Sequence, residues 1–374
     1  MARAVLALLV LALAPACGGG DDDNDDGFIV TDGSPPDAAG DPFYQAGEPI
    51  TLTRDNRAED EDPSVLAAAD GTMVVAYFAR RSGNADVYLT TTTNGTRWTD
   101  PVRITVSEWD DFAPHLIQTS DGWFHLTWYR RAPAPTNYAH VLHTRSMDLA
   151  AWDRQVETEV ADAEPIEDWV PTIAERPDGD LEIVFTSRIR GEDPPHDLYA
   201  VTSGDGGASW SEVAPLAALN DPAEHDHLPF LARTGDDQMT ITWNRCDADP
   251  ATPWTNPTSD VLIATSPDGD AWSEPRAVTA DDGGGVLDVF PALYASHAGD
   301  WSLVWVTTAL APTGTVIDLP LTGAYPDDRA TLPMTGYSPK IAATPTDGVF
   351  LGAWVEGPTG QQDIRVRFFA SPRR

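Results

Sequence analysis

The sequence predicts an all-β fold, a six-bladed β-propeller closed by an N-terminal strand. Three observations predict it. An apolar strand with a central aromatic residue occurs six times, a strand opened by proline lies upstream of each copy, and a turn that contains tryptophan follows four of them. Four-stranded units of about 50 residues that repeat in this way are typical of propeller blades.

Residues 1–43 precede the repeats and divide into two parts. Arg3, an apolar run and the small residues before Cys17 predict a secretory signal peptide at residues 1–16. Cys17 resembles the lipid-carrying residue of a bacterial lipoprotein, and plain secretion is the alternative. Residues 17–43 are rich in Gly, Asp and Pro, which predicts a flexible acidic linker. We therefore expect an exported protein that is lipid-anchored to the cell envelope, at the outer membrane or cell surface, with the anchor as its only membrane contact.

Residues 44–374 contain the six repeats and are expected to form the propeller. The last repeat stops at Arg374 without a fourth strand, whereas residues 48–53 match residues 100–105, the expected fourth strand of the first repeat. We expect the N-terminal strand to complete the last blade, because ring closure removes exposed sheet edges. The prolines that open the repeats are Pro63, Pro114, Pro171, Pro229, Pro291 and Pro339, and the central aromatic residues are Tyr77, Trp128, Phe185, Trp243, Trp305 and Trp354.

Four turns between the expected third and fourth strands share one pattern, in which an acidic or amide residue precedes a tryptophan. Asp and Asn side chains accept local backbone N–H groups and glycine adopts a positive φ, so each turn predicts a tight hairpin. The residues that carry the pattern are Asn94 and Trp98; Asp148 and Trp152; Ser203, Asp205, Gly207 and Trp210; and Ser266, Asp268 and Trp272.

This pattern resembles the Asp-box, or BNR repeat, of the sialidase superfamily of β-propellers, which reads Ser-x-Asp-x-Gly-x-Thr/Ser-Trp. The segment from Ser203 to Trp210 fits at every fixed position, and the other three turns are shorter or degenerate. The resemblance implies that the boxes lie on the face away from the active site of that family, so we interpret them as structural turns. Such a fold does not carry an activity with it.

A column of polar residues lies at the expected mouth of the central channel. An aspartate stands three residues before the proline in five repeats, and Gly336 takes its place in the sixth. Two interpretations stay open: a repeated salt bridge or strand cap that holds one blade to the next, or a pocket of catalytic carboxylates with raised pKa values. The candidate catalytic residues are Asp60, Asp111, Asp168, Asp226 and Asp288, and the candidate ligand-binding residues are Arg80, Arg131, Arg188, Arg245, Trp109 and Trp169, with Tyr138 and Trp254 nearby.

Cleavage of sialic acid is not expected from this sequence. The resemblance implies an arginine just before the first proline, which binds the substrate carboxylate, and a Tyr–Glu nucleophile pair. The chain has Glu61-Asp62-Pro63 at that place, and a carboxylate there repels the group that an arginine would attract. Tyr294 and Tyr325 exist, but nothing in the sequence pairs either of them with a glutamate.

Composition limits the partners of the protein. The chain has 59 acidic and 23 basic residues, with Lys340 as the only lysine, and its formal net charge of −36 argues against nucleic-acid binding. If Cys17 is acylated, Cys246 has no cysteine partner, so we expect no disulfide and no cysteine-based zinc site. His225 and His227 lack further metal ligands in the sequence. We expect no metal, no other cofactor and a monomer.

Two classes of function fit these observations. The preferred one is a surface-anchored propeller that binds a glycan or an extracellular protein at its channel face without chemistry, because repeat symmetry suits a scaffold. The alternative is a glycoside hydrolase or lyase, exo-sialidase-like in fold, that acts on extracellular glycans with paired carboxylates from the aspartate column. If all of these aspartates are paired with arginines, the function without chemistry is favoured.

Overall fold

The structure, a computed structural model, describes residues 44–53, 59–133, 138–152, 157–161, 167–188, 196–247, 259–279, 286–308, 314–321, 328–358 and 360–370. The predicted signal peptide and linker lie outside these residues, as do Cys17, Trp254 and Tyr325. The described residues form β-strands and one 3-10 helix, η1 (Gly235–Asp237). None of their helices is long and apolar enough to cross a membrane.

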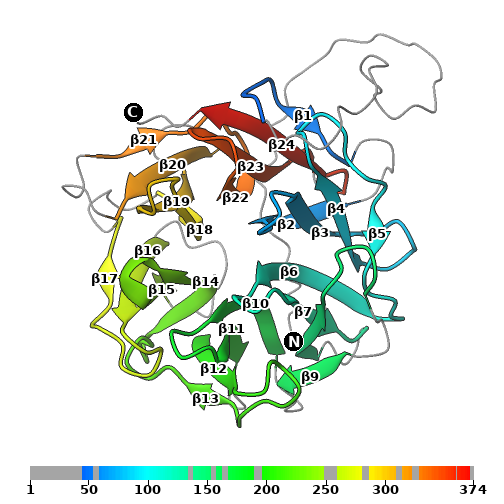
Figure 1. Ribbon diagram of the computed structural model, residues 1–374. Helices are drawn as coiled ribbons and strands as arrows, with labels where there is room; N and C mark the ends of the chain where they lie inside the picture. Colours follow the sequence, from blue (N-terminus) through cyan, green and yellow to red (C-terminus); the bar gives the residue numbers. More distant parts are fainter. Residues whose placement is uncertain are drawn as a thin grey trace.

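The strands form a β-propeller, with sheets arranged around a central axis (Figure 1). In each repeat the first strand lies nearest the axis, and the following strands pair antiparallel outward. The second strand of a repeat is covered on both faces; in β3 (Met73–Ala79), for example, all seven residues are buried. Burial on both faces explains why this strand is a continuous apolar run in the sequence.

Four of the sheets have four strands each. The first contains β2 (Asp60–Ala67), β3, β4 (Asp86–Thr92) and β5 (Val102–Arg103); another contains β14 (Glu224–Thr234), β15 (Gln238–Asp247), β16 (Asp260–Ser266) and β17 (Arg276–Ala277); the next contains β18 (Asp288–Ala295), β19 (Trp301–Thr307), β20 (Thr315–Pro320) and β21 (Ala330–Thr331); and the last contains β22 (Tyr337–Ala343), β23 (Val349–Glu356), β24 (Asp363–Ala370) and β1 (Ile50–Thr51).

The prediction of six separate blades is wrong, because the described strands form five hydrogen-bonded sheets. A parallel bridge between Ala139 and Glu167 joins the second and third repeats into one sheet. A single bridge between two strand starts leaves no periodic signal, so the sequence could not show it. This sheet contains β6 (Asp110–Gln118), β7 (Phe124–Arg131), β8 (Ala139–Ser146), β9 (Thr158–Ala161), β10 (Glu167–Glu175), β11 (Leu181–Arg188), β12 (Asp197–Ser203) and β13 (Ala214–Pro215).

The N-terminal segment supplies the outer strand of the sheet that holds the C-terminal strands. β1 pairs antiparallel with β24, with Ile50 opposite Val366, and it is shorter than the strand expected at residues 48–53. Tyr44, just before it, is fully buried and stacks on Phe368 with ring centroids 5.2 Å apart. The Tyr44 hydroxyl lies 2.8 and 2.9 Å from the carbonyl oxygens of Gly71 and Thr92 in the first sheet. The segment therefore contacts both the last sheet and the first.

Each inner strand is bent at its proline. The residue before the proline has a positive φ, between 47° and 58°, and the strand register shifts at this point. Non-glycine residues rarely adopt such a φ, and a following proline favours extended backbone, so the surrounding sheet must hold this β-bulge in place. The prolines thus lie inside the inner strands and do not open them. The bulged residues are Asp62, Ala113, Val170, Leu228, Phe290 and Ser338.

The four tryptophan-containing turns lie at the opposite ends of the sheets from the starts of the inner strands. In the turn from Ser203 to Trp210, the Asp205 carboxylate accepts the backbone N–H of Ser209 at 2.8 Å, and the Ser203 hydroxyl accepts that of Gly207 at 2.8 Å. The Asn94 amide oxygen and the carboxylates of Asp148 and Asp268 accept backbone N–H groups in the other turns. These side chains stabilise local turns and take no part in the channel mouth.

Candidate functional site

The five aspartates of the predicted column are all buried, with 3% exposure at most. The Asp111 carboxylate accepts the indole N–H of Trp128 at 3.1 Å and the Arg130 guanidinium at 2.7 and 3.0 Å. The same bond to the central tryptophan recurs twice, from Trp243 to Asp226 at 2.7 Å and from Trp305 to Asp288 at 3.0 Å. The Ser187 hydroxyl donates to Asp168, and Arg81 lies 3.7 Å from Asp60.

The backbone of the same column joins neighbouring repeats. The amide N–H groups of four of these aspartates donate to carbonyl oxygens of the repeat that precedes them in the ring. In all four cases the carbonyl group lies in the connection between the second and third strands of that repeat. The pairs are Asp60 with Gln362, Asp111 with Ala85, Asp226 with His196 and Asp288 with Ser259. Side chain and backbone together therefore link strands and repeats. This geometry supports the structural interpretation of the column, and a catalytic role remains an untested proposal.

Strand register separates the candidate arginines into two groups. Arg245 lies opposite Asp226, and its counterpart opposite Asp111 is Arg130, not Arg131. Arg131 lies opposite Asp110, and Arg188 lies opposite Glu167. Since successive side chains point to opposite faces of a strand, Arg131 and Arg188 face away from the aspartate column. The sequence alone could not choose between two adjacent arginines, because the bulge position was unknown.

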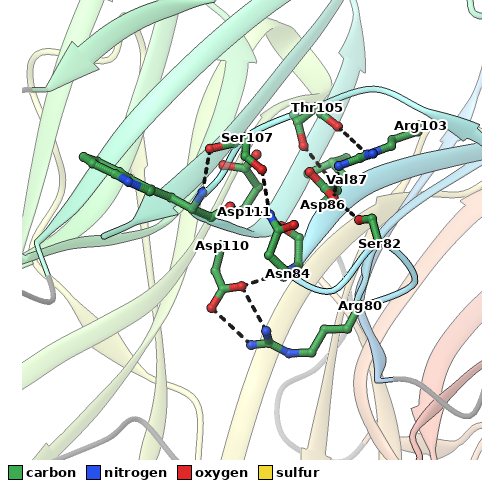
Figure 2. Close-up of polar contacts among 12 residues, drawn as sticks. Arg80, Ser82, Asn84, Asp86, Val87, Arg103, Thr105, Ser107, Asp110 and Asp111 are labelled. Carbon is green, nitrogen blue, oxygen red and sulfur yellow. Dashed lines mark hydrogen bonds and ion pairs between the residues drawn. The ribbon is translucent and has the colours of Figure 1, made fainter. Parts of the chain in front are cut away.

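A group of charged side chains, which we call the mouth cluster, lies at the strand starts of the first three repeats. Arg80 contacts the Glu59 carboxylate at 2.8 Å and the Asp110 carboxylate at 2.9 Å (Figure 2), and Asp110 also lies 3.7 Å from Arg131. Phe112 lies beneath both guanidinium groups, 5.3 Å from Arg80 and 4.8 Å from Arg131. The mouth cluster comprises Glu59, Arg80, Asp110, Arg131 and Glu167, and burial raises the pKa of Glu167.

Two tryptophans are close in sequence to members of the mouth cluster: Trp109 directly precedes Asp110, and Trp169 follows Glu167 by two residues. Trp109 is 38% exposed, and the Asn84 amide fixes its segment by donating to the carbonyl oxygens of Ser107 at 2.9 Å and Trp109 at 2.7 Å (Figure 2). Trp169 is half-buried, with its ring centroid 5.0 Å from that of His196. Charged groups of fixed orientation beside exposed aromatic surface form an arrangement that can bind a polar molecule with an apolar face.

A second group lies closer to the axis, at the bulges of β2 and β22; we call it the inner group, comprising Glu61, Asp62, Tyr337 and Lys340. Burial, with repulsion from Asp62 and Glu59, raises the pKa of Glu61 to about 8, and Tyr337 and Arg80 oppose this. Burial raises the pKa of Asp62 to about 6 and lowers the pKa of Lys340 to about 8. The attraction between the Asp62 carboxylate and the Lys340 ammonium opposes both of these shifts. Glu61 therefore holds its proton at neutral pH.

The inner group also brings a tyrosine near a glutamate. Tyr337 and Glu61 lie on the first strands of the last and first repeats, and the ring brings them together. The Lys340 ammonium donates to the Pro339 carbonyl oxygen at 3.3 Å and lies 5.7 Å from the Phe230 ring. Glu61 and Tyr337 occupy equivalent positions, two residues before their prolines, and Lys340 is the only lysine in the chain.

Histidines and Cys246 gather beside Trp169. His225 Nδ1 accepts the backbone N–H of His196 at 2.8 Å, and Cys246 Sγ lies 3.6 Å from His227 Nε2. Burial lowers the pKa of His227 to about 3, so its ring is neutral under ordinary conditions. Among the residues that the structure describes, no three or more His, Cys, Asp or Glu side chains are grouped so as to hold a metal ion.

In comparisons with known proteins, this chain matches others in structure and not in sequence. No protein-family model matches the chain, and no curated protein matches its sequence. The α-L-arabinanase of Penicillium chrysogenum, solved with arabinobiose, aligns with a TM-score of 0.69 and 11% identity over 87% of this chain and 98% of that one. The α-L-arabinofuranosidase of Fusarium graminearum aligns with a TM-score of 0.65 and 13% identity over 89% and 99%.

A Hadza microbial sialidase aligns less closely, with a TM-score of 0.58 and 12% identity over 83% of this chain and 66% of that one. These identities are low, so the likeness concerns the fold. The chain is a β-propeller protein with the fold shared by sialidase-like and arabinan-degrading glycosidases.

Proposed function

We propose that this protein is an exported propeller that binds a neutral glycan at its channel mouth. One observation carries the proposal: the mouth cluster presents fixed charged donors and acceptors, and Trp109, which is 38% exposed, directly precedes its member Asp110 in the chain. Sugar rings have apolar faces that stack on aromatic side chains and hydroxyl groups that bond to charged side chains. The arabinobiose held by one structural neighbour suggests pentose oligosaccharides as the first ligands to examine.

Calorimetric titration with arabinobiose and a panel of neutral oligosaccharides tests this proposal. Replacement of Trp109 by Ala removes the stacking surface and should weaken binding about fivefold or more, since an aromatic contact contributes about 1 kcal/mol or more. Trp272→Ala, in a turn at the opposite end of the sheets, is the control and should bind normally. Absence of saccharide binding, or equal affinities of the Trp109 and Trp272 variants, would contradict the proposal.

Glycoside hydrolysis is a second candidate, favoured by the protonated state of Glu61. A carboxyl group with a pKa near 8 can donate a proton to a glycosidic oxygen, and hydrolysis needs a second carboxylate near it. Asp62, with a lower pKa, is the neighbouring carboxylate in the inner group. Both lie on one strand that reaches the channel mouth.

Release of reducing sugar from arabino-oligosaccharides tests hydrolysis. If Glu61 is the acid, activity should fall above about pH 8, and Glu61→Gln should reduce kcat by about a hundredfold or more. Glu59→Gln removes a partner of Arg80 and one of the smaller causes of the raised Glu61 pKa, so it should have a smaller effect. Binding without any release of sugar would leave the glycan-binding function and exclude this second one for the sugars used.

The cellular location is proposed from the sequence alone. Lipidation of Cys17 would hold the propeller at the cell envelope, with residues 18–43 as the tether. The variant Cys17→Ser should then move from the membrane fraction to the soluble fraction. Unchanged membrane retention of this variant would contradict the anchor.

A further inference from the structure

A cavity of about 590 Å³ is lined by residues of β20 and β21 and of β23 and β24. These strands belong to the last two sheets, which are neighbours in the ring (Figure 1). The residues that matter for its chemistry are Gly314, Thr335, Trp354, Glu356, Arg365 and Arg367. None of them belongs to the mouth cluster or the inner group. The volume falls within the range of small-molecule sites.

Trp354 has an unsatisfied polar atom in this cavity wall. Its side chain is 1% exposed, and its indole N–H has no hydrogen-bond partner among the described residues. Three equivalent tryptophans, Trp128, Trp243 and Trp305, donate to the aspartate three residues before the proline of their repeats. A buried donor without an acceptor is costly and calls for an explanation.

Gly336 explains why the chain cannot supply the acceptor itself. It stands where the other repeats have the aspartate, and its φ is +128°. A Cβ at this position would lie 2.2 Å from the Val355 carbonyl oxygen and 2.9 Å from Cδ1 of Trp354. An aspartate side chain therefore does not fit. Cδ1 adjoins the indole nitrogen, so the N–H edge of the ring lies toward Gly336 and the neighbouring cavity residues Gly314 and Thr335.

The two arginines of the cavity give it a positive side in a strongly acidic chain. Arg365 donates to the Thr51 hydroxyl and lies 3.3 Å from the Glu356 carboxylate through Nε. Arg367 donates to the carbonyl oxygens of Gly47 at 2.9 Å and Pro333 at 3.3 Å. These contacts use Nε and Nη1 of each guanidinium, and the structure records no bond from either Nη2 to a described residue. The Nη2 groups of Arg365 and Arg367 and the indole N–H of Trp354 therefore remain as hydrogen-bond donors for a ligand.

We propose that this cavity binds a small carboxylate-bearing molecule, whose carboxylate takes the role that aspartate plays in the other repeats. Carboxylates accept bonds from guanidinium and indole N–H groups at once, as Asp226 does with Arg245 and Trp243. The tryptophans of the outer turns, Trp98, Trp210 and Trp272, also have unpaired N–H groups, but they are half-buried and do not line this cavity. This cavity shares no residue with the mouth cluster, so the proposal does not depend on the proposed glycan binding there.

Titration with D-glucuronate, followed by the indole N–H resonances in two-dimensional NMR, tests the proposal. Glucuronate should shift the Trp354 resonance, identified as the signal missing in Trp354→Phe, and D-glucose, which lacks the carboxylate, should not. Trp354→Phe keeps the aromatic ring and should weaken glucuronate binding about tenfold, and Arg365→Gln should weaken it similarly, since hydrogen bonds to charged groups are strong.

Two variants serve as controls. Trp305→Phe removes an N–H that Asp288 already accepts outside the cavity, and Trp109→Ala removes the stacking surface of the mouth; both should bind glucuronate like the original chain. A Trp354 resonance that does not move, equal responses to glucuronate and glucose, or unchanged affinity in Trp354→Phe would each overturn the proposal. Binding that depends on Trp109 would assign glucuronate to the mouth and overturn it as well.

Discussion

At the scale of single residues, the Asp226 carboxylate shows how much one buried charge holds together. It accepts the Trp243 indole N–H at 2.7 Å, the Arg245 guanidinium at 2.7 and 3.1 Å and the backbone N–H of Asp221 at 2.8 Å, with no solvent exposure. Its removal leaves a guanidinium and an indole N–H without their acceptor in the interior. The loss is therefore larger than the mean value of a hydrogen bond.

We predict that Asp226→Ala lowers the free energy of unfolding by about 3–5 kcal/mol, as the breaking of buried ion pairs does. Urea unfolding measures this change. Asp300→Ala, at an exposed position, is the control and should stay within about 0.5 kcal/mol. If the two variants are equally stable, the aspartate column does not hold the repeats together.

Glu182 gives a pH dependence at the same scale. It lies in β11 with 1% exposure, and burial raises its pKa from 4.5 to about 8, although Arg176 opposes the shift. The folded state thus favours the protonated form. The stability that Glu182 contributes is complete below pH 4.5 and is lost as the pH rises through about 8.

The variant Glu182→Gln keeps the shape of the protonated side chain and cannot ionise. We predict that it is more stable than the original chain at pH 8.5 by about 1 kcal/mol or more, and similar to it at pH 4.5. Thermal or urea unfolding across this range measures the difference. Parallel stability curves for the two proteins would show that Glu182 is already ionised in the folded state.

The site could be predicted from the sequence only in part, and the reason lies in single residues. The repeat pattern of the sequence located the aspartate column, because each aspartate stands three residues before the proline of its repeat. It could not show that Asp111 pairs with Arg130 and not Arg131, which depends on register at a bulge. Nor could it join Glu61 to Tyr337, because these residues meet only when the first and last repeats become neighbours in the ring.

At the scale of elements, the second strands were the most predictable parts of the chain. They are largely buried and carry apolar residues around an aromatic centre, in a continuous run in β3 and interrupted by polar residues in β7 and β11, which the sequence displays directly. The outer strands were less visible, since β5, β13, β17 and β21 are two residues long and partly exposed. The eight-stranded sheet was not predictable, because one parallel bridge creates it.

The N-terminal segment supports a prediction at this scale. Tyr44 is fully buried between the last and first sheets, where it packs on Phe368 and lies near the Gly71 and Thr92 carbonyl oxygens. Tyr44→Ala should lower the free energy of unfolding by about 3–5 kcal/mol, the usual loss for a large aromatic side chain. Glu48→Ala, exposed on the same segment, should have little effect.

Two deletions measured by thermal unfolding extend this test. Removal of residues 44–56 should destabilise the propeller severely, because it exposes the edge of β24 and the surfaces that cover Tyr44. Removal of residues 18–40, which precede these contacts, should change little. Equal melting temperatures for the two deletions would show that the N-terminal segment does not join the ends of the ring.

At the scale of the whole molecule, the excess of acidic residues supplies carboxylate partners for arginines at the channel mouth. Arg80 is bonded to Glu59 and Asp110, Arg131 lies near the same Asp110, and Arg245 is bonded to Asp226. With 59 acidic residues against 23 basic ones, the chain can pair each arginine at the mouth internally. A substrate carboxylate would have to compete with these partners.

We therefore predict that the purified chain does not release sialic acid from glycosides above the background rate. An exo-sialidase needs several arginines that converge on the substrate carboxylate. Here Glu61 stands at the strand start in place of an arginine, and Asp62, with a pKa of about 6, repels such a substrate at neutral pH. A fluorogenic sialoside measures the activity, with a commercial sialidase as the positive control. Turnover that disappears on replacement of Arg80, Arg131 or Arg188 by Ala would show the opposite: these arginines would then leave their carboxylate partners to bind the substrate.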